Sequence, residues 1–142
     1  PVARDRREDA EAVILGLVRE STDFLVLARY MQILSPGFLD EYGREVINIH
    51  HSFLPSFKGA DPYLQAWERG VKIIGATAHY VTGDLDEGPI IEQTVMPVSH
   101  RDDVEALKRK GRNLEKMALA NAVRAHLEHR VIRFDNRTIV FA

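Results

Sequence analysis

The sequence contains no cysteine, which excludes disulfide bonds, zinc sites with cysteine ligands and thiol nucleophiles. It also contains no apolar run of the roughly 18 residues that a membrane-spanning helix needs. Its N-terminal segment, PVARDRREDAEA, is charged where a secretory signal peptide would be apolar. We therefore expect a cytoplasmic protein that has no membrane partner.

An excess of charge of one sign is also missing. The 142 residues include 19 Lys and Arg against 21 Asp and Glu, for a net charge of -2, and the basic residues are scattered along the chain. Nucleic acid and anionic lipid are recognised by clustered basic side chains. The sequence therefore predicts no nucleic-acid partner and favours a small molecule or another protein. Its length corresponds to one domain.

Helical and extended patterns alternate through the first 50 residues. Apolar residues recur at helical spacing over residues 5–20, and four consecutive apolar residues, Phe24–Leu27, are typical of a strand covered on both faces. Residues 35–43 predict a short helix, with Ser, Pro and Gly at the positions that begin and end one. The segment EVINIH predicts a second strand. This succession indicates an α/β domain.

The later residues predict a second set of elements. These are a helix at 61–70, strands at 72–81 and 89–98, a long helix at 102–129, and a hairpin over 130–142 that turns at Asp135 and Asn136. The two strands are joined by a short turn-rich segment, TGDLDEG, so we expect them to pair antiparallel at the far side of the sheet. Gly111 lies inside the long helix, where glycine costs about 1 kcal/mol relative to alanine.

Together these elements predict an open, twisted, mostly parallel sheet with helices on both faces. The antiparallel strand pair, the C-terminal helix and the small hairpin complete it. A strand as uniformly apolar as Phe24–Leu27 requires neighbouring strands along both edges, yet no earlier strand is found in the sequence. We therefore expect these residues to form the later part of a larger α/β domain.

The adjacent histidines of NIHHSFLP are candidates for chemistry. Side chains alternate along a strand, so Asn48 and His50 should share one face, opposite Ile47 and Ile49, while His51 should point away from His50. Ligands of open α/β sheets bind at the carboxyl ends of the strands. This favours His50, although a strand-capping asparagine and a surface histidine explain the same pattern about equally well.

An acidic cluster, TGDLDEGP, adds Asp84, Asp86 and Glu87 in a tight connection. A carboxylate within about 4–6 Å of His50 would raise its pKa and fix its tautomer. Asn48 could then donate a hydrogen bond to an oxygen that becomes negative during attack on a carbonyl group. These groups are typical of acyl transfer or hydrolysis without a covalent nucleophile, although at least two of the three acids should be ordinary turn residues.

Other polar residues fit this scheme less well. Zinc ligation by His50, His51, His79 and an aspartate is the competing use of the same side chains, but the histidine spacing matches no helical metal motif, so we expect no metal. His79 is expected to be a core or supporting histidine. Ser52 and Ser56 should be loop residues, and Lys58 should be solvated.

The motifs MQILSP, INIHHSFLPSFKGADPYLQAWERGVKIIGATAHYV and DLDEGPIIEQ resemble the folate-dependent formyltransferase family. The resemblance runs from about Phe24 to the last residue and implies that family's Rossmann-like fold. Its transferases usually carry proline after the catalytic histidine, whereas NIHHSFLP, GVKIIGATAHYV and NRTIVF resemble the branch that hydrolyses 10-formyltetrahydrofolate to tetrahydrofolate and formate. The resemblance therefore implies a self-associating hydrolase that has a folate substrate and needs no further cofactor.

Position by position, the family's catalytic asparagine, histidine and aspartate fall on Asn48, His50 and Asp86. Asp86 is preferred to Asp84 because the match is to the pattern LDxGP. The pterin ring is implied to lie against the MQIL segment, largely through backbone groups, and against the connection that carries the aspartate. The implied substrate-binding residues, with the histidine that replaces the transferases' proline, are Met31, Gln32, Leu34, Val81 and His51.

Two parts of the family's pattern are missing from residues 1–142. The family's catalytic domain begins with a further strand-helix-strand region, and the hydrolytic branch carries an N-terminal ACT regulatory domain. We therefore expect residues 1–142 to be a formyltransferase-like catalytic domain without its first strands. Because the acceptor loop of the transferases lies in that region, two alternatives stay open. These are formyl transfer to an amine such as glycinamide ribonucleotide, and folate binding without catalysis.

Overall fold

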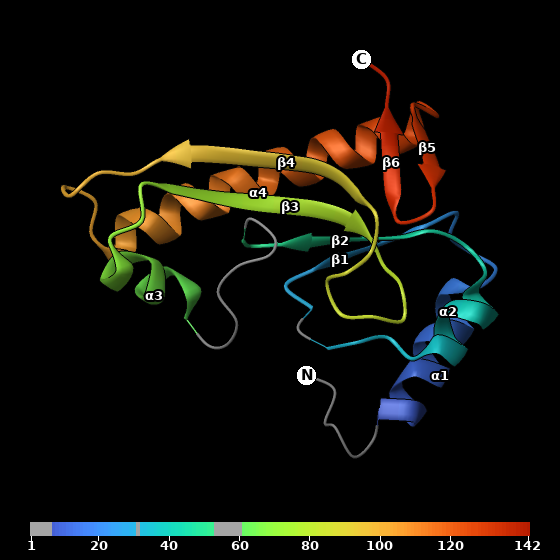
Figure 1. Ribbon diagram of the computed structural model, residues 1–142. Coiled ribbons are helices and arrows are strands. Elements are labelled where there is room, and N and C mark those ends of the chain that lie inside the picture. The colour runs from blue at the N-terminus through green and yellow to red at the C-terminus, as the bar shows by residue number, and fades with distance from the viewer. Residues whose placement is uncertain (1–6, 31, 53–60) are drawn as a thin grey trace.

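The computed structural model describes residues 7–30, 32–52 and 61–142 (Figure 1). In chain order its elements are α1 (Arg7–Val18), β1 (Leu25–Ala28), α2 (Pro36–Tyr42), β2 (Val46–His50), α3 (Pro62–Arg69), β3 (Ile73–Tyr80), β4 (Ile90–Pro97), α4 (Val104–Leu127), β5 (Val131–Phe134) and β6 (Arg137–Val140). The helices and strands that the sequence predicts are all confirmed, with ends that move by a few residues.

Four of the strands form one sheet in the order β1-β2-β3-β4, and β5 pairs with β6 in a separate hairpin. β1 and β2 are parallel, whereas β3 is antiparallel to both β2 and β4. Three of the four strands therefore run in the same direction, and the predicted α/β class and the β3–β4 pair are confirmed. The antiparallel pairing of β3 with β2 was not foreseen, and it decides which residues of β3 lie beside the polar residues of β2.

Helices cover both faces of this sheet. On one face α4 runs along β2, β3 and β4 (Figure 1), over a buried core that includes Ile47 and Ile49. On the other face α1 and α2 pack together, and Val46 of β2 belongs to this second core. Successive residues of β2 thus enter different layers, as the alternation of side chains along a strand requires.

The short helix α2 begins and ends at the predicted residues. Ser35 is the N-cap, and its hydroxyl accepts a hydrogen bond from the Phe38 amide at 3.1 Å. The same hydroxyl and the Ser35 amide donate to the buried Glu11 carboxylate of α1. Gly43 closes the helix with a left-handed φ of 64°. The carboxylate therefore holds α1 and α2 together.

Two glycines permit close approaches that a Cβ atom would block. At Gly88, in the β3–β4 connection, a Cβ would lie 1.8 Å from the backbone oxygen of Tyr80. At Gly111, in α4, it would lie 1.9 Å from the hydroxyl of Tyr63 in α3. The helix-weakening glycine noted in the sequence is therefore required by the packing of α3 against α4.

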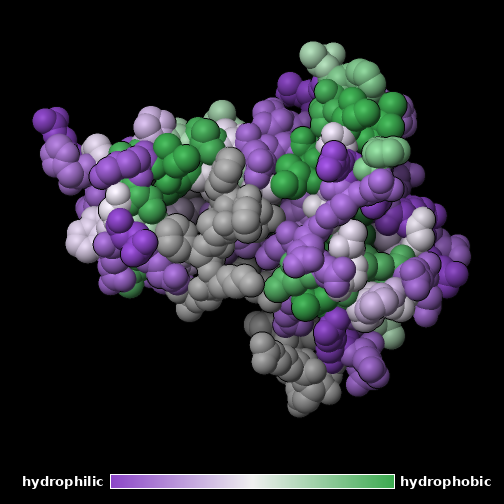
Figure 2. Space-filling view, in the orientation of Figure 1, coloured by the Kyte–Doolittle hydropathy of each residue, from purple (hydrophilic) through white to green (hydrophobic). Residues whose placement is uncertain are grey.

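The β5–β6 hairpin carries exposed apolar side chains, which form part of the green area over these strands in Figure 2. Its half-exposed large residues include Ile132, Phe134, Ile139 and Phe141. The hairpin is fastened to the sheet by Thr138, whose hydroxyl donates to the backbone oxygen of Ile90. Among the described residues, no helix is both long and apolar enough to span a membrane.

Candidate active site

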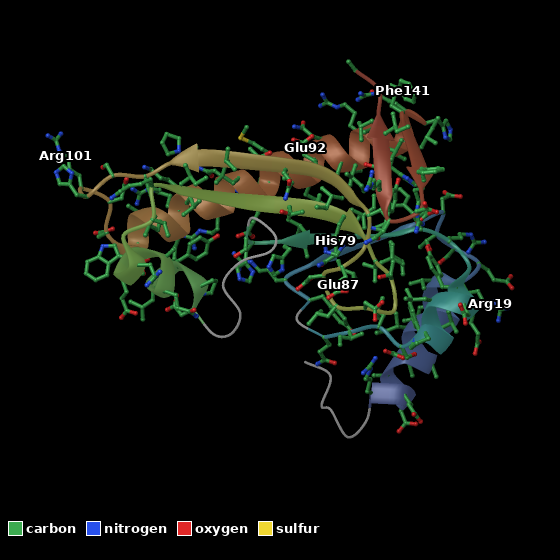
Figure 3. All side chains as sticks on the ribbon, viewed as in Figure 1. Arg19, His79, Glu87, Glu92, Arg101 and Phe141 are labelled. Carbon is green, nitrogen blue, oxygen red and sulfur yellow. The ribbon has the colours of Figure 1, made fainter. Side chains whose placement is uncertain are left out.

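Three polar side chains lie together on the paired strands β2 and β3. Asn48 and His50 share one face of β2, as predicted, and the antiparallel register places His79 of β3 directly opposite Asn48. Asn48 is 9% exposed and His79 is 2% exposed. Figure 3 labels His79 close to the β3–β4 connection, which carries Glu87. The sheet therefore forms one wall of a polar corner.

Asp86 reaches this corner from the β3–β4 connection. Its backbone is left-handed, with a φ of 56°, and the connection folds back closely because Gly88 has no side chain. One carboxylate oxygen, Oδ2, lies 3.2 Å from Nδ1 of His50. The other, Oδ1, accepts a hydrogen bond from Nδ2 of Asn48 at 3.4 Å. The structure thus brings together the three residues that were predicted to be catalytic.

The histidine of β3 is a fourth member of the cluster that the sequence did not identify as one. Nε2 of His79 lies 3.5 Å from Oδ1 of Asp86 and 3.3 Å from Nδ2 of Asn48. Its Nδ1 lies 2.8 Å from the backbone oxygen of Tyr80. Sequence reasoning gave His79 only a supporting role, because nothing in one sequence fixes the register between β2 and β3.

The contact with Asp86 determines the tautomer of His50. A carboxylate can only accept, so Nδ1 carries the proton and Nε2 of the neutral ring has a free lone pair. Burial lowers the pKa of His50 below its usual value, and it outweighs the opposing effect of Asp86. The predicted rise in this pKa is therefore wrong: the acid is near, but the ring is buried. The result is a neutral imidazole at neutral pH.

The amide of Asn48 contacts two other members of the cluster. Its NH₂ group faces Asp86 and His79, whereas its carbonyl oxygen Oδ1 is buried and has no hydrogen-bond partner among the described residues. Nε2 of His50 is likewise buried and has no hydrogen-bond partner in that part of the chain. Asn48 was expected to donate a hydrogen bond to a reacting oxygen, and this role stays a prediction.

His51 does not point away from His50. The two rings stack, with centroids 5.0 Å apart and planes inclined by 23°. The prediction assumed that the extended chain continues, but β2 ends at His50 and the chain bends there. The ring of Tyr63 in α3 lies 6.2 Å from that of His51. His51 therefore lies between the candidate catalytic imidazole and α3.

A cavity of about 310 Å³ opens beside these rings. It is lined by Arg29 and Tyr30 after β1, by Asn48, Ile49, His50 and His51, by Pro62 and Tyr63, by Leu85 and Asp86, and by Lys108, Arg112 and Glu115 of α4. The hydroxyl of Tyr63 donates to Glu115 at 3.0 Å, and burial together with this carboxylate raises the pKa of Tyr63. The cavity is large enough for part of a small organic substrate.

Three of the predicted folate-binding residues line a second hollow that borders the same cluster. Gln32, Leu34 and Val81 line a smaller hollow of about 20 Å³ together with Asn48, His79 and Asp86. Leu34 is 3% exposed and its side chain belongs to the α1–α2 core, so its backbone is the part that remains for a ligand. Met31, Ser56 and Lys58 lie outside the described residues. Their predicted roles stay predictions.

No cluster of three histidine or acidic side chains that could hold a metal ion is found within the described ranges. Nδ1 of His50 and both ring nitrogens of His79 are already in contact with protein oxygen or nitrogen atoms. What the corner offers instead is a buried neutral base, the carboxylate that orients it, and the amide of Asn48. This donor set suits proton transfer from a nucleophile better than metal ligation.

Comparison with known proteins agrees with this geometry. The model of the formyl transferase family matches residues 2–123, and the chain therefore belongs to the formyl transferase family. It is 57% identical to a formyltetrahydrofolate deformylase from Synechocystis, over 143 aligned residues that cover 100% of this chain and 50% of that protein. The chain thus spans about half the length of the curated relatives it matches.

Solved structures give the same grouping. A crystal structure of a formyltetrahydrofolate deformylase from Pseudomonas syringae superposes with a TM-score of 0.91 at 59% identity, covering 100% of this chain and 48% of that one. Glycinamide ribonucleotide transformylase 1 from Symbiobacterium toebii superposes with a TM-score of 0.83 at 35% identity, covering 99% and 65%. The fold expected from the resemblance is therefore confirmed. Identity is higher to the deformylase than to the transformylase.

Proposed function

We propose that the intact protein hydrolyses the formyl group of 10-formyltetrahydrofolate to give tetrahydrofolate and formate. The observation that carries the proposal is the His50–Asp86 contact, which leaves a buried Nε2 lone pair beside the cavity. The similarity to proteins named formyltetrahydrofolate deformylase supports the choice of substrate. Folate is the substrate in this proposal, and no separate cofactor takes part.

The proposed reaction is an acyl transfer to water. Nε2 of His50 removes one proton from the water as its oxygen bonds to the formyl carbon, and the carbonyl oxygen becomes an oxyanion. Asp86 stabilises the imidazolium of His50 that forms, and the Nε2–H group of this imidazolium stabilises the oxyanion. The same proton then passes to N10 of the folate as the C–N bond breaks. Formic acid leaves and ionises to formate, so all atoms and charges balance.

The substrate-binding roles of Met31, Gln32, Leu34, Val81 and His51 belong to this proposal. The hollow lined by Gln32, Leu34 and Val81 would receive the pterin ring, and the larger cavity would hold the formyl group and the water. We further propose that the protein acts in the cytoplasm and self-associates, without a nucleic-acid partner. These three statements are open to fractionation, light scattering and gel-shift measurements.

The experiment is an assay of formate release from 10-formyltetrahydrofolate by the intact protein with no amine present. The proposal predicts steady release by the wild type and loss of on the order of 10³-fold in His50→Ala. A matched control is His100→Ala, because His100 is exposed on the β4–α4 connection, and this variant should keep full activity.

A transferase is the second candidate, because the chain is also similar to a glycinamide ribonucleotide transformylase. The same assay separates the two functions. A transferase would be nearly inactive without an amine and would become active when glycinamide ribonucleotide is added. Tight folate binding with no reaction under either condition would instead indicate a binding module, and both results contradict the proposed hydrolysis.

A further inference from the structure

The 310 Å³ cavity carries positive charge away from the polar corner. Its lining includes Arg29, which follows β1, together with Lys108 and Arg112 of α4. The ammonium group of Lys108 lies 3.3 Å from Glu105 and 3.8 Å from an aspartate of the α3 N-cap, so its charge is already balanced. Neither arginine belongs to an ion pair in the described part of the chain. Two guanidinium groups of the cavity wall are therefore available to a ligand.

The two arginines meet at the phenol of Tyr63. Burial and the Glu115 carboxylate raise the pKa of Tyr63. The positive charges of Arg112 and Arg29 act against this rise, and an effect of this kind requires nearby charges. By contrast, neither arginine is among the groups that shift the pKa of His50. The cationic end of the cavity therefore lies toward α3 and α4, at a distance from the candidate base.

The backbone at Arg29 has an unusual conformation. Its φ of 57° is left-handed, which is uncommon for a residue other than glycine. Conformations of this kind gather at ligand-binding and active sites. Because β1 and β2 are parallel and Ala28 lies opposite Ile49, Arg29 leaves β1 beside the point where His50 ends β2. The turn therefore carries a cation into the cavity that His50 also lines.

We propose that Arg29 and Arg112 form an anion-binding subsite that receives the formate released elsewhere in the same cavity. A guanidinium group donates hydrogen bonds in a planar fork that matches a carboxylate, and formate is the smallest carboxylate. The reacting group of the substrate is a neutral formamide, whereas the product is an anion. The two arginines therefore bind the product in preference to the group from which it is formed. This inference rests on the proposed function.

The first test is product inhibition of the intact protein. Initial rates of tetrahydrofolate formation, measured at constant ionic strength with added sodium formate, give an inhibition constant. Replacing Arg29 and Arg112 together by glutamine should raise this constant on the order of tenfold, because charge-assisted hydrogen bonds are lost. Arg112→Lys should have a smaller effect, since lysine keeps the charge without the fork. Arg109→Gln is the control, because Arg109 is exposed on α4 and does not line the cavity.

The second test measures binding without turnover. Broadening of the formate proton signal in the NMR spectrum reports binding to the intact protein when no folate is present. We expect broadening with the wild type and with His50→Ala, and its loss when both arginines are replaced. Both arginines are exposed, so their replacement should leave the fold intact. Inorganic phosphate is the second probe, because it is also an anion that arginine binds.

Three results would overturn the proposal. They are an inhibition constant that the double replacement does not change, an equal rise in Arg109→Gln, and binding of phosphate without binding of formate. A wild-type protein that binds formate through the two arginines but hydrolyses no 10-formyltetrahydrofolate would refute the proposed function and confirm the anion site. Hydrolysis without formate binding would refute the anion site alone.

Discussion

The two faces of β2 show how differently one short strand is used. On the face toward α4, Ile47 and Ile49 are 0% and 8% exposed and belong to an apolar core. On the other face the strand begins with the buried Val46 and ends with Asn48 and His50, each of which has a buried atom with no hydrogen-bond partner in the described part of the chain. Leaving such an atom unpaired costs about 1–3 kcal/mol.

The comparison indicates that the α4 face of β2 stabilises the fold, whereas the other face carries the residues of the proposed reaction. The apolar side chains have interchangeable partners, because dispersion contacts are not directional. The polar side chains depend on particular atoms of Asp86 and His79, at distances of 3.2 to 3.5 Å. Substitutions on the two faces should therefore separate loss of activity from loss of stability.

The largest effect is expected from Asp86→Asn. An amide at this position can donate to Nδ1 of His50, which would move the ring proton to Nε2 and remove the base. Formate release should fall by about 10³–10⁴-fold, as for the corresponding change in a Ser-His-Asp triad, with little change in the free energy of unfolding. Asp40→Asn on the exposed side of α2 is the control. If Asp86→Asn keeps more than a tenth of the activity, Asp86 does not set the tautomer.

Ile47→Ala tests the opposite face. Ile47 is fully buried, so the variant should lose about 3 kcal/mol in the free energy of unfolding through lost contacts and a residual cavity. Activity per folded molecule should stay close to that of the wild type at low temperature. Urea unfolding and formate release measured on one sample check both statements. A large loss of turnover in fully folded protein would remove the distinction between the two faces.

Glu11→Gln should have a smaller effect, at the α1–α2 contact. Burial raises the pKa of Glu11, but hydrogen bonds from Ser35 and Arg7 outweigh it, and the pKa lies below its usual value. The ionised carboxylate therefore stabilises the fold above the usual carboxyl pKa, and this contribution is lost as pH falls through the lowered pKa. We expect a loss of about 2 kcal/mol at pH 7. A difference from the wild type that does not shrink below about pH 4 would contradict this.

The smallest net effect is expected from Gly111→Ala. Alanine favours the helix by about 1 kcal/mol, but its Cβ would overlap the Tyr63 ring, which costs about 1–3 kcal/mol. A net loss of about 1 kcal/mol should follow. In a Tyr63→Ala background the same change should become neutral or stabilising, and a double-mutant cycle of unfolding free energies measures this. Additive values would mean that Tyr63 does not require the glycine.

Local signals in the sequence predicted most of the fold. Ser35 and Gly43 marked the ends of α2 correctly because capping depends on neighbouring residues. The alternation of VINIH placed Asn48 and His50 on one face correctly, because side chains alternate along any strand. Tertiary features were not predictable in this way. The register that sets His79 against Asn48, and the close contact of Gly111 with Tyr63, join segments far apart in sequence.

Two features of the candidate site depended on its surroundings more than on residue type. The resemblance identified Asp86, and the structure puts it beside His50, yet the pKa of His50 moves down because the ring is buried. The alternation rule failed for His51 because the strand had already ended. Pairing of groups was therefore more predictable from the sequence than their electrostatic environment.

The pH dependence of kcat/KM for formate release shows whether the buried His50 is the base, because this parameter reports the ionisation of the free enzyme. His50 must be neutral to act as a base, so activity falls as pH falls through its pKa, which burial places below the usual histidine value. We predict that kcat/KM falls to half of its plateau value at a pH below about 6.5, the usual histidine pKa. A midpoint above about 6.5 would contradict a buried neutral His50 as the base.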